Sequence, residues 1–458
     1  MKTKNKRFII LLICSAIFYG AMFLLFKVGV YNDSQQYIDM HIHREPGYSF
    51  FLWLIRQVVG DLEHSLWVAA ILQNILAIFV TAKVVDFFSE EFKLNKIETT
   101  LLMLLQFVPH LVTVFMSVTK VVFSNGILSE SLCYPLFQLF IVFCYKAFFD
   151  TKNKPVIWCA VIGFLLAITR SQFMIAFLIW LVLLAIKCFM KKKYRAILIV
   201  VLLTGVMFVS RSYLFKCYNY VFNEKHFVAG TYSGVNTLAN IMYASDREDG
   251  ERIEDEFTRE MFYLMYDEMC ALGWSRENAG EGILEQGIFL ESVHDSIKFD
   301  VLDRCYADVL ENMGYTDYYD REMKADATSM EMIKALLPSC FGVWLGNYFV
   351  LAFRGMMRCI GITHPLIGIV VWGFYAFAFA MCIYKLYKDK WSKEGWLLFI
   401  ALLSILALSF STSITIMCLS RYMIYGFVPF YTALLMIVRE TEIGKLCLQR
   451  ESQCEYKI

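Results

Sequence analysis

Long apolar runs, separated by short polar or charged stretches, dominate the sequence. A helix needs about 20 apolar residues to cross the hydrocarbon core of a bilayer, and by that rule the pattern predicts ten membrane spans. They cover roughly residues 8–30, 66–88, 98–118, 127–149, 155–170, 172–190, 195–215, 365–386, 395–412 and 415–438. The first run follows a basic N-terminus and is too long for the apolar part of a signal peptide, so we interpret it as a retained first span.

Basic residues concentrate in six short segments that flank these spans. The segments are Lys2–Arg7, Lys93–Lys96, Lys152–Lys154, Lys187–Arg195, Lys385–Lys393 and Lys445–Arg450. Ten crossings with the N-terminus inside place all six on the cytoplasmic face, as the positive-inside bias requires. Residues 341–360 are also apolar, and counting them as a further span would reverse the last helices. We therefore expect 341–360 to form a helix in the outer interface, with Arg354 and Arg358 at headgroup level.

The predicted fold class is an all-α polytopic membrane protein with about ten spans. We expect a membrane domain over 1–215 with a first outer loop at 31–65, an acidic helical insert over 216–340, the interfacial helix, and a last part over 361–458 that ends in a cytoplasmic tail. The predicted location is the plasma membrane, with the insert and the functional site outside the cytoplasm.

Composition agrees with this class and excludes others. The chain of 458 residues is 58% apolar and 19% charged, whereas soluble domains are about 45–50% apolar and about 25% charged. The 43 Lys and Arg residues balance 42 Asp and Glu residues, which argues against a nucleic-acid partner. The 14 cysteines form no C-x-x-C pair, so no zinc or redox motif is indicated.

Ionisable residues near membrane depth are functional candidates, because charge is costly there. The candidates all lie on the outer side of the predicted topology. They are Asp33, Asp39, Arg44 and Glu45 in the first outer loop, Lys120 between spans three and four, Glu130 about one helical turn into span four, Arg170 at the turn between spans five and six, and Arg421 with Tyr422 at the start of the last span.

Each candidate also has a simpler interpretation. Lys120 and Arg170 have the character of anchors that reach to lipid headgroups, and Glu130 suits the positive end of a helix dipole. His41 and His43 have the spacing of a metal pair but lack a third ligand in sequence, so we interpret them as ordinary loop residues. As a set, however, the carboxylates can act as a general base, and the cations can hold a phosphate.

The motifs carrying these residues resemble integral-membrane glycosyltransferases of the C-type fold (GT-C). The resemblance rests on Asp33 followed by Arg44-Glu45-Pro46-Gly47-Tyr48, on Ser129-Glu130, on Arg170 between paired spans, and on Arg421-Tyr422 with Pro429 downstream. It covers the membrane portion through span seven and the last span, and it leaves out the acidic insert. This superfamily includes the protein O-mannosyltransferases and the aminoarabinose transferases of lipid A.

The resemblance implies inverting transfer of a sugar from a polyprenyl-phosphate donor to a glycan, lipid or protein acceptor. Asp33 would be the catalytic residue, and Arg170, Arg421 and Lys120 would bind the donor phosphate. Glu130, Asp39, Arg44, Glu45 and Tyr422 would support the site. The adjacent Asp-Glu pair of the protein O-mannosyltransferases is Asp33-Ser34 here, which argues against protein mannosylation. Some members bind a divalent metal and others do not, so the resemblance leaves a divalent-metal cofactor open.

Two other functions fit parts of the pattern. A polysaccharide polymerase or ligase with a lipid-diphosphate donor also needs outer arginines and a large outer loop, but its loop would be basic, whereas residues 216–340 are rich in Asp and Glu. A transporter of lipid-linked glycans predicts charges at mid-membrane depth and a repeated helical pattern. The predicted spans are nearly free of charge and show no internal repeat.

Overall fold

The computed structural model describes residues 2–116 and 120–440. These residues form helices and connecting loops, and their one β-bridge is an isolated pair between Gly29 and Gly126. Ten helices of the described chain are long and apolar enough to cross a bilayer, which confirms the predicted all-α polytopic membrane protein. The predicted basic segment 445–450 and the tail beyond residue 440 lie outside the described residues.

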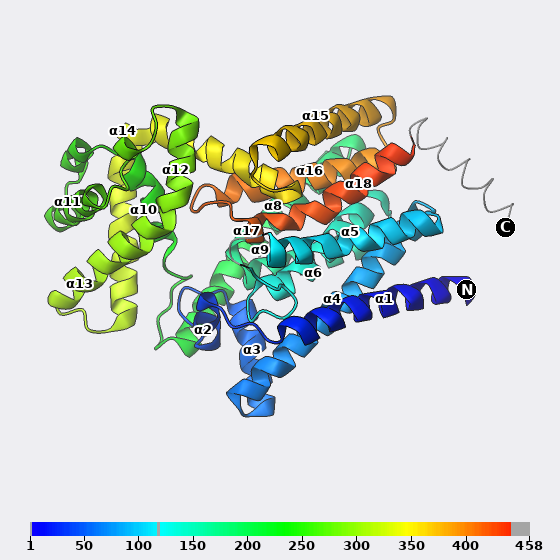
Figure 1. Ribbon diagram of the computed structural model, residues 1–458, viewed down its shortest axis with the longest axis horizontal. Coiled ribbons are helices and arrows are strands. Elements are labelled where there is room, and N and C mark those ends of the chain that lie inside the picture. Colours follow the sequence, from blue (N-terminus) through cyan, green and yellow to red (C-terminus); the bar gives the residue numbers. More distant parts are fainter. Residues whose placement is uncertain (1, 117–119, 441–458) are drawn as a thin grey trace.

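The first half of the chain supplies the membrane helices α1 (Lys2–Phe26), α4 (Leu62–Glu91), α5 (Lys96–Phe115), α6 (Glu130–Phe149), α7 (Lys154–Thr169), α8 (Ile175–Met190) and α9 (Tyr194–Phe222). The last part adds α15 (Pro365–Lys388), α16 (Lys393–Thr412) and α18 (Phe427–Arg439). Figure 1 shows these helices side by side along the long axis of the molecule. Helix α7 has 16 residues and is shorter than the ten candidate spans, which count α8 from Ser171 and include a helix that begins at Tyr318.

Ion pairs between helix ends identify one end of this layer, here called the basic end. Arg7 of α1 pairs with Asp86 of α4 at 2.7 Å, and Arg439 of α18 pairs with Glu98 of α5 at 2.9 Å. Further contacts at this end join Lys393 to Glu91, Lys385 to Glu440 and Lys187 to the Asp150 carbonyl. The short loops that we predict to share one face therefore do lie at one end of the layer.

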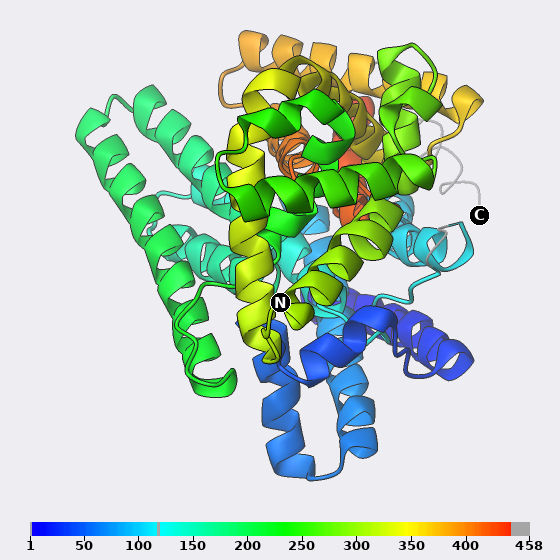
Figure 2. The same cartoon turned by 90° about the vertical axis from the view of Figure 1, so that its left-hand side faces the viewer.

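The opposite end, here called the insert end, carries a separate helical unit. Its helices are α10 (Ser233–Ala244), α11 (Glu256–Ala271), α12 (Ile283–Ser296), the π-helical segment η4 (Ile297–Asp303) and α13 (Arg304–Asn312). Residues such as Leu238, Phe262, Leu302 and Met332 form a hydrophobic core distinct from that of the membrane helices. Figure 2, which looks onto this end, shows the unit lying in front of the membrane helices.

The segment 341–360 corrects the predicted boundary at residue 340. Helix α14 runs without interruption from Tyr318 to Ile360, so the insert and the predicted interfacial helix share one helix. A proline inside a helix removes one backbone hydrogen bond, which can bend the helix instead of ending it. Pro338 lies inside α14, and Figures 1 and 2 show that this helix changes direction between its two halves.

Helix α14 is apolar and long enough to count among the ten candidate spans, but its last residues stay near the insert end. Cys359 Sγ lies 3.7 Å from Ser409 Oγ in the last turn of α16, and Arg358 donates to the Cys418 carbonyl at 2.8 Å. The following helix α15 then reaches the basic end, where Lys385 pairs with Glu440. The parity of crossings is therefore the one that the basic loops predict.

Two short helices occupy the predicted first outer loop, namely α2 (Asn32–Ile38) and α3 (Pro46–Val59). A backbone bridge holds the chain before α2 against the loop before α6, because Gly29 N donates to the Asn125 carbonyl at 3.1 Å and Ile127 N donates to the Gly29 carbonyl at 2.8 Å. A Cβ on Gly29 would lie 2.8 Å from the Tyr31 hydroxyl, which accepts a hydrogen bond from Val122 N of the same loop at 3.1 Å, so glycine leaves room for the Tyr31 ring. The bridge brings α2 beside the start of α6.

Candidate functional site

Five charged side chains from four separate stretches of the chain meet at the insert end. Asp33 of α2 accepts hydrogen bonds from Arg44 at 2.9 Å and from Arg421 at 3.0 Å. Arg170, at the turn after α7, pairs with Glu130 at 2.9 Å, and Arg421 Nε lies 4.0 Å from the same carboxylate. The site is thus one connected network of three arginines and two carboxylates.

Asp33 is the most accessible member of this network and is held on both carboxylate oxygens. Burial alone raises the pKa of its carboxyl, but Arg44, Arg421 and Arg170 together lower that pKa below its ordinary value. The group is therefore ionised at neutral pH. Its side chain is 31% exposed, so an acceptor hydroxyl can approach a carboxylate oxygen, which is the geometry that a general base needs.

Glu130 is the buried member, with a side chain that is 1% exposed. It is the first residue of α6, about one turn nearer the end of the span than we predict, where its charge faces the positive end of the helix dipole. Within the described chain its Oε1 atom has no hydrogen-bond partner, and neither has the Arg421 Nε atom 4.0 Å away. A polar atom of a ligand or a water between them would satisfy both.

Tyr422 links the two arginines that come from opposite parts of the sequence. Its ring lies 4.7 Å from the Arg170 guanidinium and 4.8 Å from that of Arg421. Its hydroxyl accepts a hydrogen bond from Arg421 Nη2 at 2.7 Å, and its carbonyl accepts one from Gln172 at 2.7 Å. Cation–π contacts of this kind hold a guanidinium plane in position, so Tyr422 orients both cations.

Glu45 positions the Arg170 turn and does not contact Asp33. Its Oε1 atom accepts from the backbone N–H of Ser171 at 2.7 Å. The approach depends on Gly47, because a Cβ there would lie 2.8 Å from the Ile168 carbonyl. Arg211 of α9 donates to Ser171 Oγ at 2.6 Å from the other side. This membrane arginine, which the sequence analysis does not single out, therefore supports the same turn.

Neutral side chains to which the sequence analysis assigns no role connect the two halves of the network. Ser129 Oγ accepts from Arg170 Nη1 at 3.0 Å and lies 2.9 Å from the Tyr37 hydroxyl. The Tyr37 ring in turn lies 4.9 Å from the Arg44 guanidinium. Tyr37 follows Asp33 by four positions on α2, a spacing that puts both on one helix face. That spacing is a usable signal only once residues 32–38 are known to be helical.

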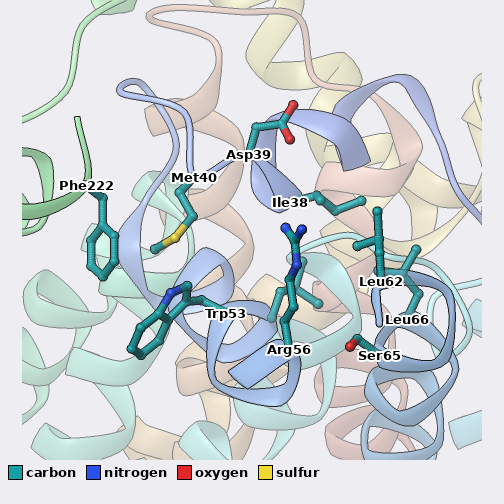
Figure 3. Close-up of a pocket in the computed structure, with 10 residues that line it drawn as sticks. Ile38, Asp39, Met40, Trp53, Arg56, Leu62, Ser65, Leu66 and Phe222 are labelled. Atoms are coloured by element: carbon teal, nitrogen blue, oxygen red, sulfur yellow. The ribbon is translucent and has the colours of Figure 1, made fainter. Parts of the chain in front are cut away.

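Two predicted site residues lie apart from this network. Lys120 is exposed, and among residues 2–116 and 120–440 no hydrogen bond or ion pair of its side chain is found. Asp39 is also exposed, and it accepts from Gln35 Nε2 at 2.8 Å. It lines a different pocket of about 220 Å³ between α2, α3 and α4. Figure 3 shows Arg56 extending into that pocket beneath the end of α2.

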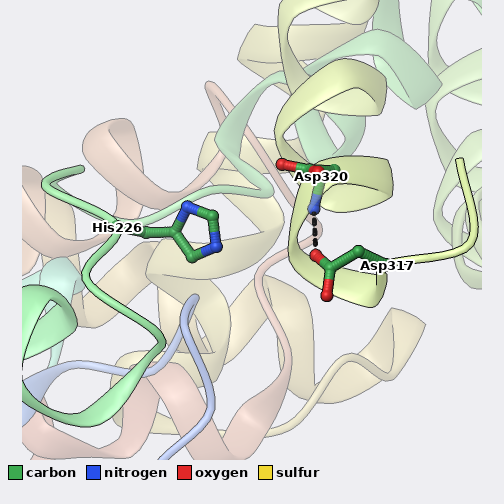
Figure 4. Close-up of side chains that lie close together, drawn as sticks. All are labelled: His226, Asp317 and Asp320. Carbon is green, nitrogen blue, oxygen red and sulfur yellow. Dashed lines mark hydrogen bonds between the residues drawn. The ribbon is translucent and has the colours of Figure 1, made fainter.

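One group of side chains in the described chain has the geometry of a metal site, and it lies outside the network. His226, Asp317 and Asp320 present atoms within 4.8 Å of one another (Figure 4). Asp317 already has a structural role, since its Oδ1 atom accepts from the Asp320 backbone N–H and caps α14. His41 and His43 face each other with Nδ1 atoms 3.0 Å apart, and burial lowers the pKa of His41 to about 4.

The network thus combines an accessible carboxylate with guanidinium groups at the insert end of a membrane-helix layer. Such a set can accept a proton from a hydroxyl and hold a phosphate. Comparison with protein-family models, with curated proteins and with solved structures finds no match to this chain.

Proposed function

We propose that the protein is a membrane glycosyltransferase that moves a sugar from a polyprenyl-phosphate donor to an acceptor outside the cytoplasm. The observation that carries the proposal is the position of Asp33 between Arg44 and Arg421, beside the Glu130–Arg170 pair. A base and phosphate-binding cations are the groups that this reaction requires at one place. The resemblance to the C-type glycosyltransferases in the same residues supports it.

The location of the network suits a donor that is part lipid. It lies where α2, α6, α7 and α17 (Ser420–Met423) come together at the insert end of the apolar helix layer. A phosphate bound there stays at headgroup level while its polyprenyl chain remains among the apolar helices. The insert lies over the same end (Figure 2), so it is placed to contact an acceptor that is bound at the network.

The charge of the network favours a monophosphate. Three arginines and two carboxylates leave one net positive charge, and a polyprenyl-phosphate sugar is a phosphodiester with one negative charge. A diphosphate donor carries a second negative charge that these residues do not balance. A polymerase or ligase that uses a lipid diphosphate is therefore the less favoured enzyme.

In the proposed mechanism the donor phosphate binds Arg421 in place of the two carboxylates, Asp33 and Glu130. Asp33, released from Arg421, is then able to accept a proton. The acceptor oxygen attacks the anomeric carbon while its proton passes to Asp33. The bond from the anomeric carbon to the phosphate oxygen breaks, and the electron pair leaves with the polyprenyl phosphate. Arg170 and Arg421 stabilise the charge on this leaving group. A single displacement inverts the anomeric configuration.

The test compares D33N with D39N in the purified protein in lipid nanodiscs. Asparagine at 33 keeps the size of the side chain but accepts no proton, so we expect transfer from radiolabelled polyprenyl-phosphate hexoses to fall by about 100-fold or more. Asp39 lies on the same loop but outside the network, so D39N should retain wild-type turnover. Wild-type turnover in D33N would rule out the mechanism.

A binding measurement separates the donor classes. We expect R421Q to weaken binding of polyprenyl monophosphate by about 10-fold or more, because a hydrogen bond to a charged group contributes about 1.5–3 kcal/mol. The wild-type protein should bind a polyprenyl-phosphate hexose, the phosphodiester with one negative charge, at least as tightly as the corresponding polyprenyl-diphosphate hexose. Clear preference for the diphosphate would favour the polymerase or ligase instead.

A further inference from the structure

A buried lysine of the insert lies close to the proposed site without a hydrogen-bonding partner. Lys298, in η4, is 8% exposed. Its ammonium lies 4.4 Å from the centre of the Tyr232 ring and 4.1 Å from that of Phe299. Among the described residues no hydrogen bond or ion pair of this ammonium is found. Charges in protein interiors are normally paired and hydrogen-bonded; the Lys298 ammonium is unpaired and reaches the surface of the described chain, so its three N–H donors are open to a ligand.

Contacts of Tyr232 connect this lysine to the loop that carries Arg44. The Tyr232 ring stacks on His43, the residue before Arg44, with ring centres 4.9 Å apart. Its hydroxyl donates to Asp303 Oδ2 at 2.5 Å. Burial lowers the pKa of Lys298 to about 8, and the charges of Asp303, Asp295, Arg44 and Asp33 all act on it. Through the Tyr232 ring, Lys298 is therefore connected to His43, the residue before Arg44.

The backbone at Tyr232 is strained, as it is at seven other non-glycine residues of the described chain. Its φ is +83°, in the left-handed region that favours glycine. Non-glycine residues in this region cluster at ligand-binding positions, where the surrounding structure holds them. Here the Tyr232 side chain is fixed between His43, Lys298 and Asp303. The strain is thus located at the residue that joins the insert to the Arg44 loop.

The chemistry around Lys298 suits a hydroxyl-bearing ligand better than an anion. Asp295 and Asp303 both lie near enough to raise the pKa of the lysine, and these carboxylates would repel an anionic group. Adjacent sugar hydroxyls can accept from the ammonium and donate to a carboxylate. Phe299 is 50% exposed and offers an aromatic surface to the C–H face of a sugar ring.

We propose that Lys298, with Asp303 and Phe299, binds a neutral sugar of the acceptor, so that the acceptor is a carbohydrate. The inference rests on the proposed function, because it takes Asp33 as the base that activates the acceptor. In this arrangement the insert supplies the acceptor side of the site, and the arginines of the membrane domain supply the donor side.

The experiment measures binding of neutral methyl hexopyranosides to the full-length protein in nanodiscs by saturation-transfer NMR. We expect K298M, which keeps the length and apolar packing of the side chain, to weaken binding by about 10-fold or more. K324M is the matched control, because Lys324 also belongs to the insert and lies 5.0 Å from the Phe257 ring. K324M should bind the glycosides as the wild type does.

Two further measurements keep the outcome decisive. Polyprenyl monophosphate binding is recorded for every variant, and K298M should keep the wild-type affinity while the acceptor KM rises. If K298M does not fold, K298Q takes its place, since glutamine tolerates burial and carries no charge. Wild-type glycoside binding in the folded variant, or stronger binding of an anionic hexuronic acid than of the neutral glycosides, would overturn the proposal. If the proposed function itself is wrong, the wild-type protein will not turn over polyprenyl-phosphate sugars, a result that is distinct from the glycoside-binding outcome.

Discussion

Replacing Glu130 by glutamine tests whether the buried ion pair with Arg170 holds the site together. The carboxylate is 1% exposed and its partner 15% exposed, with 2.9 Å between Oε2 and Nη1. The substitution E130Q removes one charge of the pair and leaves the Arg170 cation in place. Arg170 then retains its hydrogen bond to Ser129 Oγ and its contact with the Tyr422 ring.

The size of the effect follows from burial. Removing one partner of a buried pair costs about 3–5 kcal/mol, and because Arg170 keeps two other contacts we expect about 2–4 kcal/mol here. The matched control is the Arg247–Asp267 pair, whose side chains are 55% and 53% exposed at a distance of 2.7 Å. An exposed pair contributes about 0–1 kcal/mol, so D267N should be nearly neutral.

Thermal unfolding of both variants in nanodiscs provides the assay. At roughly 1–2 °C per kcal/mol for a chain of this size, E130Q should lower the unfolding midpoint by about 2–8 °C and D267N by about 2 °C or less. The same substitution raises the net charge of the network by one, so affinity for polyprenyl monophosphate should be retained or increased. Equal midpoints for E130Q and D267N would contradict the argument from burial.

Three other predictions follow from the described contacts. Burial lowers the pKa of His41 to about 4 from an ordinary value of 6.5, so the folded state binds fewer protons than the unfolded state. The free energy of unfolding should therefore fall as pH drops from about 6.5 toward about 4. H41Q should flatten this pH dependence in unfolding curves, and an unchanged slope in H41Q would contradict the prediction. An epitope inserted beside Gly314 should be accessible on intact cells and one beside Lys390 only after permeabilisation; the reverse pattern would invert the topology. Because Glu291 pairs with Arg358, which holds the Cys418 carbonyl, E291Q should weaken polyprenyl-phosphate binding several-fold without contacting the ligand; wild-type affinity would exclude this link.

The membrane helices could be predicted from the sequence because their signal is local. Apolar length and the position of basic loops require no knowledge of packing, and the ion pairs at the basic end agree with the predicted grouping of those loops. The elements that escaped prediction depend on tertiary contacts. Helix α2 has seven residues, a length that has no stability alone. Its helical state depends on burial of Ser34 and Tyr37 against the rest of the site.

The convergence of Asp33, Arg170 and Arg421 was expected from their common side of the membrane, and the structure places them in one network. Their catalytic and phosphate-binding roles stay predictions. Sidedness alone does not separate members of a site from neighbours on the same face, which is why Lys120 and Asp39 were grouped with them. The separation depends on the direction in which each loop residue points, and no sequence spacing encodes it.

Lys298 escaped prediction because its link to the site depends on contacts between the insert and the membrane domain. These contacts also show how the insert takes part in the site. One continuous helical stretch, α12 with η4, carries both Glu291 and Lys298, seven positions apart and so on nearly one face. Glu291 pairs with Arg358, which donates to the Cys418 carbonyl shortly before Arg421. Lys298 contacts the Tyr232 ring, which stacks on His43 beside Arg44. Each of the two arginines that hold Asp33 is therefore connected to this stretch of the insert. A change in the position of α12 and η4 would act on both at once, so the insert helps to set the geometry of Asp33, the residue proposed as the base.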